Sequence, residues 1–289
     1  AGVINIVHGL GSGVGEEIVK HKSVSVISFT GGTKTGKRIA SIASKQFKKL
    51  SLELGGKNPN IIFSDTDVEK AVNWAIKSSF LNQGQICLCG SRLFIEKGVY
   101  EKFKNLFVKK TKALVVGGPK ESKSFLGAVV SKDHMKNILT KISSAKKDGG
   151  VILTGGKRKT MLGKLKKGYY IEPTIIEGLG YLSKTNQEEI FGPVVCLIPF
   201  EKEEDVIKMA NSTVYGLSAS IFTENISRAH RVAAKIKSGV VWINSWLIRD
   251  LRIPFGGMKS SGLGREGGFN SLDFFTESKN VCLKIDSKT

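Results

Sequence analysis

Two of the four cysteines, Cys87 and Cys89, stand in the segment FLNQGQICLCGSR with one residue between them. A cysteine is a nucleophile as its thiolate, which backbone N–H groups, a helix N-terminus or a nearby cation stabilise. Gly84 and Gly90 allow the backbone to approach a substrate closely. Three amide side chains can hold such a loop by hydrogen bonds, those of Asn82, Gln83 and Gln85. Because a free cysteine is more often a small buried apolar residue, the segment alone leaves open whether either thiol reacts.

Glu53 is the second residue suited to chemistry. It stands between two leucines in LELGGK, on a predicted strand that ends in Gly55 and Gly56. Open parallel sheets place their ligands at the carboxyl ends of strands, and a partly desolvated carboxylate there can act as a general base on water. An ordinary exposed strand glutamate is the alternative that the segment leaves open.

The glycine-rich turns GLGSGVG and FTGGTKTG are the third feature. The first lacks the G-x-G-x-x-G fingerprint, because Val14 stands where the third glycine belongs. The second places Gly31 and Gly32 between a predicted strand and a predicted helix, where free N–H groups can hold a pyrophosphate. A plain turn without a ligand remains the alternative.

The elements around these residues alternate between strand and helix, a pattern that predicts an α/β fold with a parallel sheet. The N-terminal segment GVINIVHG (2–9) is predicted as a strand and GGKNP (55–59) as the one hint of a domain boundary. The other predicted helices are 15–21, 34–45, 65–80, 100–112, 132–147, 203–211 and 227–236, and the other predicted strands are 24–29, 48–54, 151–154, 194–200 and 239–244.

The formal charge of +20 invites a nucleic-acid interpretation. Only eight of the 45 basic residues are arginine, and the lysines are spread as singles and pairs, without the arginine and aromatic clusters that nucleic-acid readers use. We therefore expect a lysine-rich solvated surface and no nucleic-acid partner. No apolar run is long enough to span a membrane. Four cysteines in a chain of this length do not form a disulfide scaffold, so we expect reduced thiols and a cytoplasmic protein. The Cys-x-Cys spacing without a nearby histidine argues against a metal site.

Five motifs, in this order and at these separations, resemble the NAD(P)-dependent aldehyde dehydrogenase superfamily: LELGGKNP, NQGQICLCGSR, EEIFGPV, NSTVYGLSA and PFGGMKSSGLGRE. In the family's Asn-Gln-Gly-Gln-x-Cys pattern the nucleophile is the cysteine two places after the second glutamine. The resemblance thus identifies Cys87 as the nucleophile, Cys89 as a structural neighbour and Glu53 as the general base. It implies oxidation of an aldehyde to a carboxylic acid through a cysteine thioester.

The same resemblance implies an NAD cofactor, with NADP left open. Glu189 and Phe191 of EEIFGP match the residues that hold the nicotinamide ribose and flank its ring. Gly31 and Gly32 match the turn beside the pyrophosphate, although the family often has serine in place of Gly32, and Leu54 is a further expected cofactor contact.

Three segments taken together, NSWLIRDLRIPFGGMKSSGLGREGG, KKLSLELGGKNP and CLCGSR, are particularly similar to the 2-aminomuconic and 2-hydroxymuconic semialdehyde dehydrogenases of tryptophan and aromatic-ring catabolism. Their substrates carry a carboxylate at the end far from the aldehyde. The planar fork of an arginine can bind such a group bidentately, and Arg249 is the first candidate and Arg252 the second. A solvent-facing loop arginine is the alternative for each.

The resemblance covers the C-terminal three-fifths of the family's usual length, so we expect an N-terminally truncated member. It implies a partial Rossmann-type cofactor lobe (1–54), an α/β catalytic lobe (55–255), and a return segment with an oligomerisation strand (256–289) at VCLKI, pairing chains into a homodimer or homotetramer. A shortened, non-catalytic relative that acts in binding or assembly is the second hypothesis.

Overall fold

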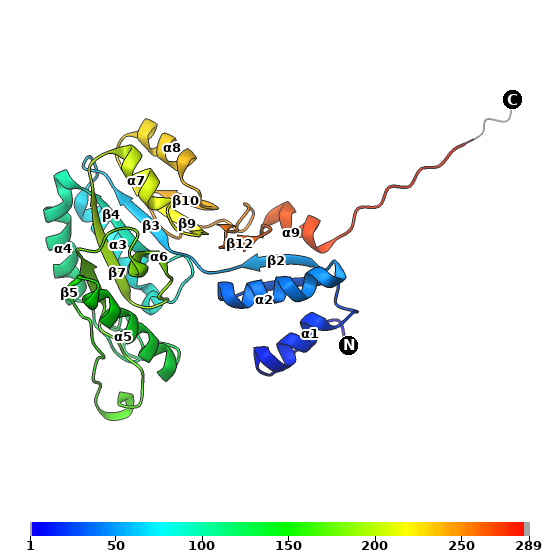
Figure 1. The fold of residues 1–289 in the computed structure, drawn as a ribbon, viewed down its shortest axis with the longest axis horizontal. Helices are drawn as coiled ribbons and strands as arrows, with labels where there is room; N and C mark the ends of the chain where they lie inside the picture. The colour runs from blue at the N-terminus through cyan, green and yellow to red at the C-terminus, as the bar shows by residue number, and fades with distance from the viewer. Residues whose placement is uncertain (1, 286–289) are drawn as a thin grey trace.

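The computed structural model describes residues 2–285, whose strands form two main sheets of unequal size (Figure 1). The smaller sheet has the order β1 (Val26–Thr30), β2 (Lys49–Glu53) and β12 (Gly262–Leu263). The larger sheet has the order β10 (Val240–Ile243), β9 (Ser218–Phe222), β3 (Asn58–Ile62), β4 (Gly90–Glu96), β7 (Val194–Phe200), β6 (Thr174–Glu177) and β5 (Val151–Thr154). A short pair, β8 (Tyr215–Gly216) and β11 (Met258–Lys259), stands apart. The neighbours in the larger sheet run parallel except β5, which is antiparallel to β6, so the predicted α/β class is confirmed.

Helices cover both faces of the larger sheet, because successive strand residues point to opposite sides. Ile62 packs into a cluster with α3 (Val68–Phe80) and α4 (Tyr100–Lys112). Its neighbour Ile61 packs on the other face with α7 (Glu203–Ala210) and α8 (Ile226–Lys235). A third apolar cluster joins β6 and β7 to α5 (Lys132–Lys147).

The remaining helical segments are η1 (Gly11–Gly15), α1 (Glu16–Lys20), α2 (Thr33–Ala43), η2 (Ser44–Gln46), η3 (Leu81–Gly84), η4 (Lys97–Val99), η5 (Gly163–Leu165), α6 (Lys184–Gln187) and α9 (Gly268–Phe275).

The chain passes from the smaller sheet to the larger between the end of β2 and the start of β3, at the predicted boundary segment (Figure 1). The far end of the chain returns here, since β12 adds antiparallel to β2. Ser261 fixes this return: its carbonyl accepts from the Leu54 N–H at 2.8 Å, and its Oγ donates to the Gly55 carbonyl at 2.7 Å. Residues far apart in sequence therefore meet at the junction of the two sheets. The domain limits given above stay predictions.

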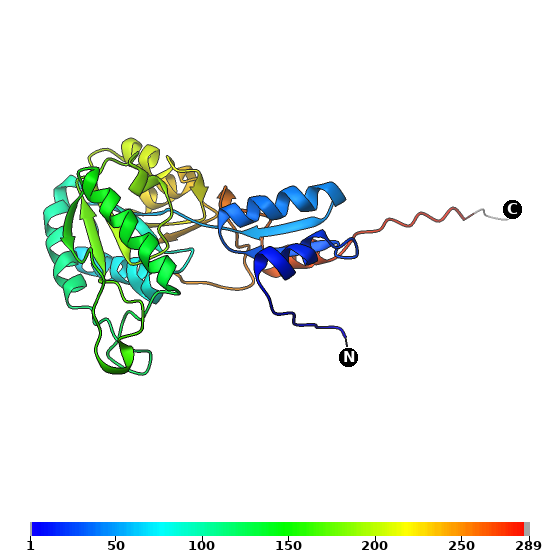
Figure 2. The same cartoon turned by 60° about the horizontal axis from the view of Figure 1, so that its bottom comes forward.

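The prediction of a strand at 2–9 is wrong. These residues have no regular structure, and their apolar side chains, such as those of Val3 and Ile4, are exposed. A strand needs a neighbour to satisfy its backbone, and within residues 2–285 none pairs with this segment, which leads away from the body (Figure 2). Besides the two-residue strands β8, β11 and β12, four strands of the larger sheet were not predicted, β3, β4, β6 and β9. They are buried on both faces and lack the polar–apolar alternation that marks a half-exposed strand.

The C-terminal segment 281–285 is extended and runs away from the body (Figure 1). Val281, Leu283 and Ile285 alternate along it and are all exposed. Among the described residues it joins no sheet, so its role as an oligomerisation strand stays a prediction. No helix within 2–285 is long and apolar enough to cross a membrane.

Candidate active site

The loop that carries Cys87 follows α3 through three consecutive residues in the left-handed conformation. Asn82, Gln83 and Gly84 have φ angles of 51°, 57° and 67°. A Cβ on Gly84 would lie 2.2 Å from the Gly192 carbonyl oxygen, so only glycine allows this close approach. The turn thus reverses the chain and places the Cys87 loop against the EEIFGP loop.

The amide side chains hold this loop as its sequence indicated. Asn82 Nδ2 donates to the Gln85 carbonyl at 3.1 Å. Gln85 Oε1 accepts from the Val130 N–H at 3.1 Å. With its amide oriented to suit its neighbours, Gln83 accepts from the Gly127 N–H at 2.7 Å. These contacts tie the Cys87 loop to the segment before α5.

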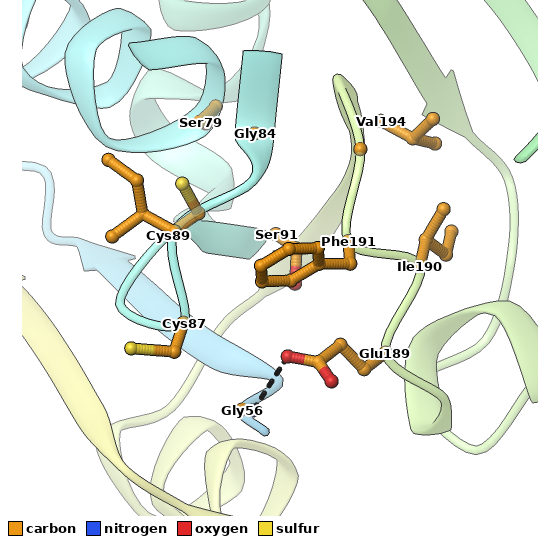
Figure 3. A pocket seen from close by; sticks show the side chains of 12 residues that line it. Gly56, Ser79, Gly84, Cys87, Cys89, Ser91, Glu189, Ile190, Phe191 and Val194 are labelled. Atoms are coloured by element: carbon orange, nitrogen blue, oxygen red, sulfur yellow. Dashed lines mark hydrogen bonds between the residues drawn. The ribbon is translucent and has the colours of Figure 1, made fainter. Parts of the chain in front are cut away.

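The two thiols of the loop differ in exposure. Cys89 is buried, and burial raises its pKa to about 12, which fits a structural thiol. Cys87 is only partly buried, and Figure 3 shows the two side chains leaving the loop in different directions. Burial raises the pKa of Cys87, and the charges of Glu53 and Glu189 raise it further, while the N–H groups of Cys87 and Leu88 act in the opposite direction. The structure therefore brings both predicted acidic residues within electrostatic reach of Cys87.

Glu53 ends β2 and is almost completely buried, with 5% of its surface exposed. Within the described chain neither carboxylate oxygen has a hydrogen-bond partner. Burial and the charge of Glu266 raise its pKa to about 7, against the opposing charges of Arg265 and Arg249. A carboxyl group with a pKa near neutrality can take a proton from water, which is what a general base must do.

Glu189 points across a narrow cavity toward Gly56 (Figure 3). Its Oε1 accepts a hydrogen bond from the Gly56 N–H at 3.0 Å. Burial raises the pKa of Glu189. The cavity also borders Cys87 and Phe191, and its volume of about 20 Å³ has room for about one water molecule.

Two contacts from α5 fix the loop that carries these residues. His134 Nε2 lies 2.7 Å from the Phe191 carbonyl oxygen, and Lys141 Nζ donates to the Glu189 carbonyl at 3.1 Å. Phe191 adopts a left-handed φ of 55°, and 38% of the residue is exposed. Such a held but accessible ring is suited to contact a planar ligand.

The other predicted cofactor contacts lie in the smaller sheet and its helix. Gly32 is the N-cap of α2 and has no side chain to cap the first helical N–H groups, which leaves them for a ligand. A Cβ at Gly32 would touch nothing, whereas one at Gly31 would meet the Phe29 ring at 2.5 Å. Leu54 is buried among the apolar residues beneath α2, and its N–H donates to the Ser261 carbonyl. A polar contact from Leu54 to a cofactor would therefore use its carbonyl oxygen.

The two candidate arginines have different surroundings. The Arg249 guanidinium lies 4.0 Å from the centre of the Phe255 ring and borders a cavity of about 320 Å³. The same cavity is lined by Arg265 and Glu266, and the charge of Arg249 lowers the pKa of Glu53. Arg252 is an exposed residue that pairs with Asp250, at 2.9 Å from Nε to Oδ1. The structure thus places Arg249 within electrostatic reach of Glu53, at a cavity that neither Glu53 nor Cys87 lines, and Arg252 toward solvent.

Two buried polar residues directly after Gly56, Lys57 and Asn58, were not predicted as site residues. Lys57 is 2% exposed, its Nζ has no hydrogen-bond partner in the described chain, and burial lowers its pKa to about 8. Asn58 is 3% exposed, and its side chain bonds the carbonyl groups of Cys87 and Cys89. A lysine and an asparagine before an apolar strand were the available signal, since buried polar groups need partners. Within residues 2–285 no cluster of His, Cys, Asp and Glu side chains is arranged to hold a metal ion.

Several known proteins are similar to this chain over nearly its whole length. The 2-aminomuconic semialdehyde dehydrogenase of Mus musculus is 47% identical over 285 residues, covering 98% of this chain and 58% of that protein. The 2-hydroxymuconic semialdehyde dehydrogenase of Pseudomonas sp. (strain CF600) is 43% identical, covering 99% of this chain and 59% of that protein. The chain therefore spans somewhat more than half the length of these relatives.

Solved structures show the same similarity. The betaine aldehyde dehydrogenase of Staphylococcus aureus in complex with NAD+ superposes with a TM-score of 0.89 at 40% identity, covering 92% of this chain and 52% of that one. HpcC from Thermus thermophilus gives a TM-score of 0.92 at 37% identity, covering 98% of this chain and 56% of that one. The model of the aldehyde dehydrogenase family matches residues 1–281. By these matches and its five motifs, the chain belongs to the aldehyde dehydrogenase family.

Proposed function

We propose that the protein oxidises an aldehyde to a carboxylic acid with NAD, through a thioester on Cys87. The observation that carries the proposal is the meeting of Cys87, Glu53 and Glu189, from separate motifs, at the junction of the two sheets. Cys87 is the more accessible thiol of its loop, and Glu53 is a buried carboxyl group with a pKa near 7.

In the proposed reaction, Cys87 Sγ adds to the aldehyde carbon and forms a tetrahedral thiohemiacetal. The Cys87 backbone N–H stabilises the oxyanion that develops. When held by the candidate cofactor residues, NAD would supply the oxidation as the acceptor of a hydride from this carbon. Glu53 then takes a proton from water, which attacks the thioester carbonyl and releases the carboxylic acid and the Cys87 thiol.

The described residues fit an NAD cofactor. The uncapped N-terminus of α2 at Gly32 offers N–H groups to a pyrophosphate, and the open space at this glycine leaves room for it. The Glu189 carboxylate suits a ribose hydroxyl pair, the Phe191 ring suits the face of the nicotinamide, and Leu54 offers its carbonyl oxygen. NAD rather than NADP is proposed because a solved relative holds NAD+.

We further propose that the substrate is a semialdehyde of the muconic type, in keeping with the names of the relatives. Such a substrate carries a carboxylate away from the reacting aldehyde. Arg249 borders a cavity and its charge acts on Glu53, so it is the proposed partner of this carboxylate, whereas the guanidinium of Arg252 is occupied by Asp250. The proposed setting is the cytoplasm, as a homodimer or homotetramer joined through 281–285.

The test is NADH formation by the purified chain with NAD and a muconic-type semialdehyde, next to Cys87→Ser and Cys89→Ser. The proposal predicts that turnover is lost with Cys87→Ser and kept with Cys89→Ser. Turnover that survives in Cys87→Ser would refute the assignment of the nucleophile.

A further inference from the structure

Asn58 lies at the start of β3 beneath the Cys87 loop, and every polar position of its amide is engaged. Its Nδ2 donates to the Cys87 carbonyl at 2.7 Å and to the Cys89 carbonyl at 2.9 Å. Its Oδ1 accepts from the Ser218 N–H at 3.1 Å. Two acceptors on one side and a donor on the other fix which amide atom is nitrogen. The side chain therefore clamps both ends of the Cys-Leu-Cys segment from β3.

The Leu88 carbonyl, which lies between these two in the chain, is also held. Trp246 Nε1 donates to the Leu88 carbonyl at 3.0 Å, and the hydroxyl of Ser218 approaches the same oxygen at 3.5 Å. The Ile86 carbonyl accepts from the Cys89 N–H at 2.9 Å. The acceptor groups of residues 86–89 are thus all engaged within the protein.

Holding a carbonyl also fixes the direction of the N–H that shares its peptide unit. In a trans peptide the C=O and the N–H point to opposite sides, and the described chain contains no cis peptide bond. Because Asn58 holds the Cys87 carbonyl, the Leu88 N–H points away from β3. The Ile86 carbonyl shares its peptide unit with the Cys87 N–H, so its bond from the Cys89 N–H fixes the direction of the Cys87 N–H by the same geometry. These two N–H groups are the ones that interact favourably with the Cys87 thiolate.

Gly56 makes the contact between Asn58 and the loop sterically feasible. A Cβ on this residue would lie 2.7 Å from Asn58 Oδ1 and 2.8 Å from the Cys87 carbonyl oxygen. The sequence Gly-Lys-Asn after Glu53 therefore supplies both the space and the clamp.

We propose that Asn58 is a positioning residue for the nucleophile: by holding the Cys87 carbonyl it keeps the Leu88 N–H directed at the thiol, and by holding the Cys89 carbonyl it fixes the residue whose N–H bonds the Ile86 carbonyl. The inference rests on the proposed role of Cys87. Its physical weight comes from the surroundings, because burial and the charges of Glu53 and Glu189 oppose ionisation of Cys87, whereas the N–H groups of Cys87 and Leu88 favour it. The oriented N–H groups are then the part of the described site that favours the thiolate.

Asn60 provides a matched control, since it is also a buried asparagine of β3, two residues further along and therefore on the same face. Its Nδ2 donates to Ser78 Oγ at 2.6 Å, without contact to the cysteine loop carbonyls. Replacing Asn60 thus removes a buried amide of the same type while leaving the clamp in place.

The experiment measures the rate at which iodoacetamide alkylates Cys87 across a pH series in the chain, Asn58→Ala and Asn60→Ala. Fragmentation mass spectrometry separates the label on Cys87 from that on Cys89. We expect Asn58→Ala to raise the apparent pKa of Cys87 and slow its alkylation at pH 8 by about tenfold, as one pKa unit implies. Asn60→Ala should leave both quantities unchanged.

An unchanged pKa in Asn58→Ala, or an equal rise in both variants, would overturn the inference, because either result means that Asn58 only fills a buried site. If an alanine variant does not fold by circular dichroism, the near-isosteric pair Asn58→Leu and Asn60→Leu takes its place with the same expectations. The assay needs neither aldehyde nor NAD. Its failure is therefore distinguishable from failure of the proposed dehydrogenase reaction, which is read from turnover in Cys87→Ser.

Discussion

Glu53 gives the most quantitative prediction, because its carboxyl group is buried without a hydrogen-bond partner in the described chain. The environment raises its pKa from an ordinary value of 4.5 to about 7. At low pH the group is protonated in both the folded and the unfolded chain, so it carries no penalty. As the pH rises from 4.5 to 7 the unfolded chain loses this proton first, and the folded state is progressively destabilised.

The size of the effect follows from the two pKa values. A rise of about 2.5 at about 1.4 kcal/mol per unit corresponds to about 3 kcal/mol, present in full above pH 7 and absent below pH 4.5. Glu53→Gln keeps the shape of the side chain and removes its charge. We therefore expect this variant to be more stable than the unmodified chain by about 3 kcal/mol at pH 8, with the difference vanishing toward pH 4.5.

Urea unfolding at pH 4.5, 6 and 8, followed by circular dichroism, measures this difference. A difference that does not vary with pH would refute the reasoning, since a packing change alone has no such dependence. Equal stability at pH 8 would show that Glu53 is not desolvated as the structure indicates. In an active preparation the same variant should lose turnover by about 100-fold or more, because glutamine cannot take a proton from water.

Three further predictions concern other parts of the molecule. Lys57→Met should raise the free energy of unfolding by about 3 kcal/mol at pH 7, because burial lowers the pKa of Lys57 from 10.5 to about 8. The cost of burying the charged lysine is present in full below pH 8 and fades toward pH 10.5. A gain in stability, measured by urea unfolding, that persists at pH 10.5 would contradict this prediction. Arg249→Ala should raise KM for a muconic-type semialdehyde by about tenfold or more, but not KM for an uncharged aldehyde. Arg252→Ala should change neither KM value. A larger effect of Arg252→Ala than of Arg249→Ala would reject Arg249 as the carboxylate partner. A chain ending before Val281 should form a smaller assembly than the unmodified chain in light scattering, and equal masses would exclude 281–285 as the oligomerisation strand.

Much of the architecture could be predicted from local patterns. The helices at 132–147 and 100–112 were predicted with the bounds that α5 and α4 show, because their apolar residues recur at helical spacing. The strand at 2–9 was wrong because a local pattern of β-branched residues does not reveal whether a neighbouring strand exists to pair with it. The buried strands such as β4 lacked alternation, and short apolar runs of this kind do not separate strand from helix.

The candidate site shows the same division. Cys87, Glu53 and Glu189 could be named because they stand in recognisable motifs, and the structure places them together. Asn58 could not be assigned, because its partners lie about 30 and 160 residues further along the chain and meet it only through sheet pairing. The pKa of Glu53 was equally out of reach, since the charges that act on it come from the returning segment near Glu266.

The central claim is that Cys87 carries the acyl group, and trapping that group tests it most directly. The Glu53→Gln variant should slow release of the thioester, so brief incubation with NAD and a muconic-type semialdehyde should let it accumulate. We predict that peptide mass spectrometry finds the acyl group on Cys87, and that Cys87→Ser in the same background carries none. An acyl group on Cys89, or NADH formed at an undiminished rate by Cys87→Ser, would contradict the account.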